Sequence, residues 1–369
     1  MNPPFSPEPP ETPEPEGLSF AGTMRRGSFE LEAAFTCAPG EVLGVLGPNG
    51  SGKSTLVAGI SGLEHLTSGE LRVGEACWDD GRGHAVPPGH RQVGLMTAAG
   101  DIFGHLDALE NVAFGLRARG VSRSAARRRA RQELEQVGIA DLASRRPHEL
   151  SSGQAQRVAL ARALALDPRV LLLDEPLSAI DQSGRDELRA LLGERLARTD
   201  AVTLLVTHNP LEALTLADRL LFLEAGRVTQ LAPPQDVVRY PRTAFAARVV
   251  GLNLWRGTSD GRAITTPGGA RIMAADVPPS GERAFAAFAP TAVSLWREVP
   301  AGSPRNTWPL VVQQIEHTGT LARVHLRGDA GVAADLVADV TLEAVTELGL
   351  HHGSHVAASV KATDVTLYR

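Results

Sequence analysis

The feature that most restricts the fold of this chain is a glycine-rich loop, Gly47 to Thr55 (GPNGSGKST). The residues before it, EVLGVL, have the apolar pattern of a buried strand, and the residues STLVAGIS have that of a helix. The loop satisfies G-x-x-x-x-G-K-[ST] in the strand–loop–helix context that this phosphate-binding motif requires. The sequence therefore predicts an α/β domain that binds a nucleotide.

Each residue type in this loop suits a phosphate. The glycines let backbone N–H groups face phosphate oxygens, and the N-terminus of the following helix adds the positive end of its dipole. We expect Lys53 to reach the β- and γ-phosphates and the Ser54 hydroxyl to coordinate Mg²⁺. The expected nucleotide-binding residues of the loop are Gly47, Pro48, Asn49, Gly50, Ser51, Gly52, Lys53, Ser54 and Thr55.

Two later apolar segments end in polar side chains that suit phosphate chemistry. Asp174 and Glu175 follow the run VLLL, and His208 follows VTLLVT. Parallel strands deliver the residues after them to one edge of the sheet, so we expect the three side chains beside the glycine-rich loop. There Asp174 would support Mg²⁺, Glu175 would act as the general base on water, and His208 would contact the γ-phosphate.

The run LSSGQAQRVALARAL at 150–164 lies between the loop and the acidic strand end. With these motifs it resembles the signature segment of the ATPases of ABC transporters, although Ser152 stands where glycine is commoner. The resemblance covers 18–231 and implies a head-to-tail pair of subunits. Ser151 and Gly153 of one copy would then cap the γ-phosphate that Lys53 of the other holds. The further nucleotide-binding residues that the resemblance implies are Gln154 and, in the D-loop-like segment 178–181, Asp181.

One position departs from the family pattern. The segment 91–116 resembles the stretch that holds the Q-loop, and Ala98 occupies the position where glutamine is usual. The side chain of alanine cannot bind Mg²⁺, orient water or form a hydrogen bond. We expect a working but slower ATPase, with a non-hydrolysing variant as the alternative. Phe20 and Phe29 are candidates for stacking on adenine, and both are also compatible with core packing.

The chain is expected to have four parts. These are a Pro- and Glu-rich disordered tail at 1–17, an ATP-binding domain at 18–232, a linker with the start of a regulatory region at 233–299, and a small OB-like β-barrel at 300–369. Strands are expected at 41–46, 93–96, 170–173, 203–206, 220–223, 311–315, 322–326, 336–340 and 356–360. Helices are expected at 54–61, 123–137, 153–166, 184–197 and 211–217, and the resemblance implies a helical subdomain.

Composition argues against several other classes of protein. The net charge of -5 gives no footprint for nucleic acid, so the five arginines between 123 and 131 are interpreted as a solvated helix face. Two cysteines do not make a disulfide framework, and no Cys/His cluster has metal-ligand spacing. No apolar run approaches the roughly 18 residues of a membrane span. A protein of this kind that works at a membrane is expected to be peripheral, on its cytoplasmic face.

The C-terminal part has a second resemblance. The segments SPRN at 303–306 and ASVKAT at 358–363 resemble the molybdate-binding barrel (TOBE or MOP type) of molybdate importer ATPases. A tetrahedral dianion is bound by N–H groups, hydroxyls and one or two cations. The candidate oxyanion ligands are Ser303, Arg305, Lys361 and Thr363, although each could instead only complete the small barrel.

These observations together predict the ATP-hydrolysing subunit of an ABC importer for an oxyanion, most of all molybdate, with ATP and Mg²⁺ as cofactors. The partners implied by the resemblance are a second copy, integral membrane permease subunits and, indirectly, a periplasmic or lipoprotein substrate-binding protein. One alternative is an importer ATPase for sulfate, iron or polyamines. Another is an oxyanion-sensing nucleotide switch without turnover, which Ala98 keeps open. An ABC-type ATPase of DNA repair or translation would need coiled-coil insertions or tandem cassettes, and the sequence has neither.

Overall fold

The computed structural model describes residues 17–98, 102–178, 180, 182–300, 302–328 and 335–369. The chain divides into two compact units, Met1–Pro234 and Gln235–Arg369, and each is described by itself. The tail expected at 1–17 lies outside the described residues, apart from Gly17.

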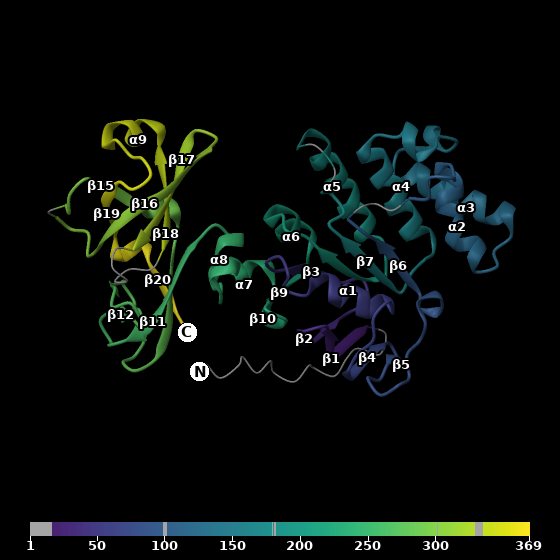
Figure 1. Ribbon diagram of the computed structural model, residues 1–369, viewed down its shortest axis with the longest axis horizontal. Coiled ribbons are helices and arrows are strands. Elements are labelled where there is room, and N and C mark those ends of the chain that lie inside the picture. The colour runs from purple at the N-terminus through teal and green to yellow at the C-terminus, as the bar shows by residue number, and fades with distance from the viewer. Residues whose placement is uncertain (1–16, 99–101, 179, 181, 301, 329–334) are drawn as a thin grey trace. The chain divides into compact units, whose positions relative to one another are not determined.

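A ten-stranded sheet is the frame of the first unit (Figure 1). Its strands are β1 (Leu18–Arg26), β2 (Phe29–Cys37), β3 (Val42–Leu46), β4 (Ser68–Val73), β5 (Ala76–Asp79), β6 (Val93–Met96), β7 (Val170–Asp174), β8 (Val202–Val206), β9 (Arg219–Glu224) and β10 (Arg227–Ala232). Their order in the sheet is β5-β4-β1-β2-β10-β9-β3-β8-β7-β6. From β9 to β6 neighbouring strands pair in parallel, whereas β1, β2, β4 and β5 pair antiparallel.

The six helices that the described residues of this unit form follow the expected alternation with strands. They are α1 (Lys53–Ser61), α2 (Ala108–Ala118), α3 (Arg123–Gln136), α4 (Ser152–Ala165), α5 (Gln182–Leu196) and α6 (Pro210–Leu216). Every strand and helix predicted from the sequence within 18–231 is present, with ends that differ by one or two residues. Helices α2, α3 and α4 pack on one another at one side of the unit (Figure 1), which confirms the implied helical subdomain.

The central strands are mostly apolar because both faces of this part of the sheet are covered. All residues of β3 and β8 are buried. Successive residues of β7 enter different cores: Leu172 lies in the cluster that includes Leu56 of α1, and Leu173 lies in the cluster that includes Val158 of α4. The strand that carries Asp174 is therefore anchored from both sides.

A buried carboxylate joins the helical subdomain to α5. The side chain of Glu133 on α3 is 1% exposed and lies 2.8 Å from Arg129 Nη2 and 2.6 Å from Arg195 Nη2. Arg195 belongs to the last turn of α5, so this ion pair links residues 62 positions apart. Leu192 and Leu196 of α5 also pack in the same core as Ala126 and Leu134 of α3.

The second unit consists of two five-stranded sheets, ordered β13-β12-β11-β14-β20 and β15-β19-β16-β17-β18. Its helices are α7 (Pro234–Arg239), α8 (Ala244–Val249) and α9 (Leu342–Leu348). The first residue of α7, Pro234, is the last residue of the first unit. Its strands are β11 (Asn253–Ser259), β12 (Ile264–Thr265), β13 (Arg271–Ile272), β14 (Arg283–Phe288), β15 (Ser294–Trp296), β16 (Asn306–Thr318), β17 (Leu321–Gly328), β18 (Leu336–Thr341), β19 (His355–Val360) and β20 (Thr366–Tyr368). The four strands predicted between 311 and 360 lie within β16 to β19.

Five strands lie in the region 233–299, where the sequence predicted a linker and the start of a regulatory region. The reason is burial: Trp255 of β11 and Phe288 of β14 pack in one core with Trp308 of β16. The ring centroids of Trp255 and Trp308 are 4.5 Å apart, and those of Trp255 and Phe288 are 5.9 Å apart. The β-rich fold thus begins well before residue 300.

None of the helices in the described part of the chain is both long and apolar enough to cross a membrane.

The Glu133 ion pairs give a first testable expectation. Replacing the buried carboxylate by an amide (Glu133→Gln) leaves Arg195 without its counter-charge, so the free energy of unfolding should fall by about 2 kcal/mol. Urea unfolding followed by circular dichroism measures this difference. Glu135→Gln, an exposed position on the same helix, is the matched control and should change stability little. Equal stabilities of the two variants would show that the ion pairs contribute nothing.

Candidate functional site

The glycine-rich loop wraps its own lysine. Lys53 Nζ donates to the carbonyl oxygens of Gly47 (2.8 Å) and Pro48 (3.0 Å). Gly50 and Gly52 have φ values of 76° and 108°, a region that side chains disfavour. Helix α1 begins directly after Gly52, and no side chain caps its N-terminus. The first N–H groups of this helix are therefore available to an anion, as the sequence predicted.

The backbone approaches closely around this loop. A Cβ atom on Gly47 would lie 2.0 Å from the carbonyl oxygen of Leu223, and one on Gly52 would lie 3.0 Å from Phe29 Cζ. Phe29 is half-buried beside the loop, whereas Phe20 is 0% exposed and stacks on Phe35. Of the two aromatic candidates, Phe20 is thus a core residue, and Phe29 is the one next to the phosphate-binding loop.

The two carboxylates stand at the end of β7, beside the ends of β8 and β3. Asp174 pairs with Val206 of β8, which in turn pairs with Val45 of β3. Glu175 has a φ of 51°, and its N–H donates to the Val206 carbonyl oxygen (2.8 Å). Such a conformation is strained for a residue with a side chain, and backbone strain of this kind gathers at functional sites.

His208 contacts the second carboxylate directly. Its Nδ1 atom lies 3.2 Å from Glu175 Oε1, and the side chains are 67% and 31% exposed respectively. The structure therefore brings Lys53, Asp174, Glu175 and His208 to one edge of the sheet. This is the arrangement that the strand-end argument predicted.

Electrostatics at this edge are unbalanced. Burial, and then the neighbouring Glu175 carboxylate, raise the pKa of Asp174, while Lys53 opposes this shift. Burial lowers the pKa of Lys53, opposed by Glu175 and Asp174. Two carboxylates thus share one partly desolvated ammonium, and an added cation would relieve their repulsion. Within the described residues no group of three or more His, Cys, Asp or Glu side chains could hold a metal ion. A cation at this edge would therefore also need oxygen atoms from a molecule that the protein binds there.

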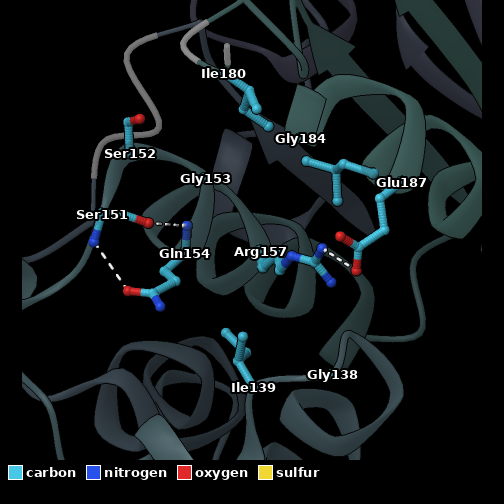
Figure 2. Close-up of a pocket in the computed structure, with 11 residues that line it drawn as sticks. Gly138, Ile139, Ser151, Ser152, Gly153, Gln154, Arg157, Ile180, Gly184 and Glu187 are labelled. Carbon is cyan, nitrogen blue, oxygen red and sulfur yellow. Dashed lines mark hydrogen bonds and ion pairs between the residues drawn. The ribbon is translucent and has the colours of Figure 1, made fainter. Parts of the chain in front are cut away.

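The signature segment forms the start of α4 and faces a hollow (Figure 2). Ser151 is the N-cap of the helix: its Oγ accepts from Gln154 N (3.3 Å), and Gln154 Oε1 accepts from Ser151 N (2.9 Å). This reciprocal capping box uses two of the unpaired N–H groups and leaves those of Ser152 and Gly153. No hydrogen bond or ion pair in the described chain joins this segment to the loop 47–55, so one copy does not unite the two motifs.

Two remaining predicted positions of this unit have different outcomes. Ala98 follows β6, is exposed and offers only a methyl group. Asp181 lies outside the described residues, as does residue 179 of the same D-loop-like segment. Ser178, the first residue of that segment, turns back on the end of β7, because its N–H (3.1 Å) and its Oγ (2.9 Å) both donate to the Glu175 carbonyl oxygen.

A buried arginine that no sequence motif predicted holds helix α1 in place. Arg91 is 1% exposed, and its guanidinium donates to carbonyl oxygens of two elements and a loop. The acceptors are Gly59, Ile60, Trp78 and Val86, at 2.6–3.1 Å. Because Gly59 and Ile60 end α1, the cation also meets the negative end of the helix dipole. The only available signal was an arginine two residues before an apolar strand.

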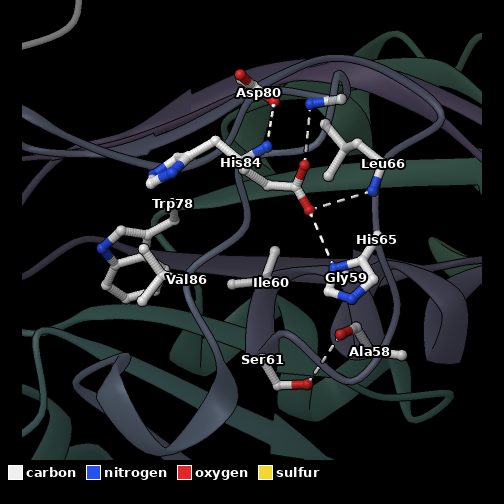
Figure 3. A network of polar contacts seen from close by, with 12 residues as sticks. Ala58, Gly59, Ile60, Ser61, His65, Leu66, Trp78, Asp80, His84 and Val86 are labelled. Atoms are coloured by element: carbon white, nitrogen blue, oxygen red, sulfur yellow. Dashed lines mark hydrogen bonds and ion pairs between the residues drawn. The ribbon is translucent and has the colours of Figure 1, made fainter.

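An acidic residue, Asp79, extends this support to the segment that follows the same helix. The Asp79 carboxylate accepts from Leu66 N (3.2 Å) and Gly81 N (2.9 Å) and lies 3.5 Å from His65 Nδ1 (Figure 3). Asp79 is 2% exposed and lies 3.9 Å from Arg91 Nη2. The end of α1 and the strand β5 are thereby tied into one polar network.

In the second unit, the register brings two of the oxyanion candidates together. Asn306 at the start of β16 pairs with Val360 at the end of β19, so Arg305 and Lys361 flank the same end of the ladder. Both are exposed, and in the described chain neither forms an ion pair. Ser303 is also exposed, and Thr363 Oγ1 donates to Asp364 Oδ1 (3.3 Å). The Asn306 side chain accepts from Met273 N (2.7 Å) and donates to the Met273 carbonyl oxygen (2.9 Å), so its role is structural.

Comparison with known proteins agrees with these observations. A family model described as ABC transporter matches residues 32–178, and one described as TOBE domain matches residues 302–367. A solved dimeric structure of the ATP-binding cassette MJ0796, bound to ADP and Pi, has a TM-score of 0.51 and 26% identity. The match covers 59% of this chain and 98% of that chain.

Several curated relatives extend over the whole chain or a large part of it. The molybdenum import ATP-binding protein ModC of Mycobacterium tuberculosis (strain ATCC 25618 / H37Rv) is 42% identical over 92% of this chain and 94% of its own length. The Fe(3+) ions import ATP-binding protein FbpC of Streptomyces coelicolor is 37% identical over 96% of this chain and 97% of its own. The spermidine/putrescine import ATP-binding protein PotA of Frankia alni is 45% identical over 64% and 50%.

The repulsion at the strand ends predicts a gain in stability when one charge is removed. Because the pKa of Asp174 is raised in the folded protein, its ionised form destabilises the fold above that pKa. Asp174→Asn should therefore raise the melting temperature of the ligand-free protein at pH 7.5, by an amount that solvent screening of this half-buried group limits. This gain should shrink as the pH falls through the raised pKa toward the ordinary value of 3.8, where wild-type Asp174 is also neutral.

Thermal unfolding of both proteins at pH 7.5 and at pH 5 measures this gain. Asp186→Asn, on the exposed face of α5, is the control for removing one carboxylate elsewhere. A loss of stability in Asp174→Asn at pH 7.5 would show that Lys53 more than compensates for the burial of this carboxylate.

Proposed function

The chain belongs to the family of ATP-binding subunits of ABC importers and is an ATP hydrolase, and from this premise we propose that its cargo is an oxyanion, in the first place molybdate. The observation that carries the cargo proposal is the pair Arg305 and Lys361 at one end of the β16–β19 ladder, in a segment that matches the TOBE model. Together with ModC, which aligns along both units, this pair favours molybdate. The roles proposed below follow from the geometry of the strand-end site.

Binding of the nucleotide would use the loop 47–55. Lys53 would exchange its bonds to the Gly47 and Pro48 carbonyl oxygens for the β- and γ-phosphates. Mg²⁺, when bound, would neutralise charge that develops on the phosphate oxygens. The residues that would hold it are Ser54 and Asp174. Burial, and then the Glu175 carboxylate, raise the pKa of Asp174, and a divalent cation would offset that repulsion. Phe29 would flank the nucleotide beside Gly52.

Glu175 is the proposed general base. Glu175 directly follows the buried strand β7, and its backbone has a positive φ. This strained conformation gives its side chain a direction different from the one that a continued strand would give. The Glu175 carboxylate would accept a proton from water as the water attacks the γ-phosphorus. His208, already 3.2 Å from this carboxylate, would orient it and contact the γ-phosphate with its other ring nitrogen.

A second copy would complete the site. Within the described residues, the capping box leaves the N–H groups of Ser152 and Gly153 unused, and no hydrogen bond joins the signature segment to its own loop 47–55. In a head-to-tail dimer Ser151, Gly153 and Gln154 would close over the nucleotide of the partner, with Asp181 nearby. We propose membrane permease subunits as the further partner and a peripheral place at the cytoplasmic face of the membrane. A substrate-binding protein would act through the permease.

Lysine usage supports a specific task for Lys361. Of 37 basic residues, 35 are arginine, and the two lysines are Lys53 and Lys361. Lysine carries a compact point charge on a flexible stem, whereas arginine offers a planar fork. A chain that uses arginine at almost every other basic position retains lysine at the phosphate-binding loop and at the proposed oxyanion site. The proposed partner of Lys53 is a phosphate group of the nucleotide, and a tetrahedral oxyanion at Lys361 would present similar oxygens to the second lysine.

Two alternatives remain as outcomes of experiment. FbpC, named for Fe(3+) ions, aligns with slightly more of this chain than ModC does (96% against 92%) at lower identity (37% against 42%), which keeps a cation or another cargo open. The nucleotide-switch alternative depends on Ala98, which deprives the site of one side-chain ligand. Sustained turnover by the purified protein would exclude a switch without hydrolysis.

The general-base proposal predicts the behaviour of Glu175→Gln. Phosphate release should fall at least about 100-fold, because the amide accepts no proton, while affinity for ATP is retained. A fluorescent ATP analogue measures binding, and a coupled phosphate assay measures turnover. The control Glu135→Gln, on an exposed face of α3, should keep wild-type turnover. Unchanged turnover in Glu175→Gln would assign the base to another group.

The cargo proposal can be tested on the full chain, because chemical modification of Lys53 monitors the nucleotide site and modification of Lys361 monitors the proposed oxyanion site. Mass spectrometry after amine acetylation should show that molybdate and tungstate protect Lys361, and that ATP protects Lys53. By calorimetry, Lys361→Gln should weaken molybdate binding at least about tenfold, whereas Arg327→Gln, an exposed position on β17, should not. Equal binding of sulfate would move the cargo to another oxyanion, and no binding of any oxyanion would reject the cargo proposal while leaving the ATPase intact.

A further inference from the structure

We propose that Arg157 is a positioning residue that holds the signature segment in register with helix α5 through Glu187. The inference rests on the proposed function, because it concerns the two segments that a second copy would meet. The signature segment begins α4, and α5 starts directly after the D-loop-like segment 178–181. The ion pair between these helices would let the two segments approach a partner as one surface.

Arg157 contacts three elements at once. Its Nη1 donates to the carbonyl oxygen of Val137 at the end of α3 (2.9 Å), and its Nη2 donates to Glu187 Oε1 on α5 (2.9 Å). Arg157 lies on α4, three residues after Gln154, and Figure 2 shows its ion pair with Glu187 among the residues that line the hollow. This hollow is lined by Ser151–Gln154 on one side and by Gly184, Glu187 and Leu188 on the other.

The bond to Val137 has a simple physical reason. The last carbonyl groups of a helix lack intrahelical partners, and a basic side chain satisfies them while meeting the negative end of the dipole. Gly138, which follows, has a φ of 72°, and a Cβ atom there would lie 3.5 Å from Arg157 Nη1. The guanidinium is thereby anchored on one side, and its second nitrogen is aimed at α5.

The ion pair to Glu187 is suited to alignment more than to stability. The side chain of Arg157 is 16% exposed, whereas that of Glu187 is 75% exposed. Pairs with one such exposed partner contribute little to the free energy of unfolding. What the pair sets is the distance between the start of α4 and the start of α5, on opposite sides of the hollow. Neither side chain contacts the loop 47–55 in the described part of the chain.

The neighbouring residue provides a matched control. Asp186 also lies on α5 and also pairs with an arginine, Arg189, at 2.8 Å and with side chains 69% and 13% exposed. That pair lies within α5, whereas the Glu187 pair joins α5 to α4. Glu187→Gln and Asp186→Asn therefore remove the same charge from adjacent positions with nearly the same exposure. Only the first removes a link between the two segments.

The experiment uses the full chain and three readouts. These are affinity for a fluorescent ATP analogue, ATP-dependent dimer formation by light scattering in the Glu175→Gln background, and turnover in the otherwise wild-type chain. Glu187→Gln should lower turnover at saturating ATP about two- to fivefold and weaken the dimer by a similar factor, with nucleotide affinity and melting temperature unchanged. Glu187→Asp, which keeps the charge, should recover most of both. Asp186→Asn should behave as wild type.

Equal behaviour of Glu187→Gln and Asp186→Asn would overturn the proposal. So would a loss of nucleotide affinity or melting temperature in Glu187→Gln that accounts for the loss of turnover, because that result indicates a merely structural pair. Arg157→Lys adds a second test, since its ammonium cannot bond Val137 and Glu187 in the same fork geometry and should give the same loss as Glu187→Gln. A wild-type chain that hydrolyses no ATP and forms no dimer would instead reject the proposed function itself.

Discussion

The parallel backbone ladder of β3, β8 and β7 is the constraint on which the candidate site depends. It sets Val45 beside Val206 and Val206 beside Asp174, so that three strands end at one edge. The residues that follow them then meet, although the loop at Gly47 and the histidine at 208 are far apart in sequence. Neighbouring residues of β7 enter opposite cores. A slip of one residue in the pairing of β7 would therefore turn each of its side chains to the opposite face of the sheet and move Asp174 away from the edge.

Without a ligand, like charges and backbone strain at this edge of the sheet oppose the stabilisation that the packing of the strands provides. Asp174 and Glu175 are adjacent carboxylates that share one partly buried ammonium, and Glu175 has a positive φ. Strain and like charges persist at such a place when the surrounding fold tolerates them and a ligand relieves them. Here the tolerance comes from the buried strands, and from Arg91 and Asp79, which hold the far end of α1.

Local patterns were sufficient for β3, β6 to β9, α1 and α3 to α6 of the first unit, because segments such as β7 and α4 carry their signals within a few residues. They did not predict the strands β1, β2, β4, β5 and β10 or the helix α2. They were insufficient for β11 to β15, two of which contain only two residues and lie among Gly and Pro. Those strands depend on burial of Trp255 and Phe288 against Trp308, a contact that no local pattern encodes. Arg91 and Arg157 escaped for the same reason: each is defined by carbonyl groups of other elements, whereas Lys53 is defined by its own loop.

The substitution at position 98 shows how much of the site is independent of that side chain. Ala98 follows β6, the edge strand beside β7, and contributes no hydrogen bond through its side chain. The position of β6 is nevertheless set, by its parallel pairing to β7 and by Arg91, which precedes it and grips the end of α1. The geometry of Lys53, Asp174 and Glu175 is thus maintained by backbone pairing and by a buried cation. An alanine at 98 then removes one ligand from the site and leaves the frame that holds the others, which argues for slower hydrolysis and against its loss.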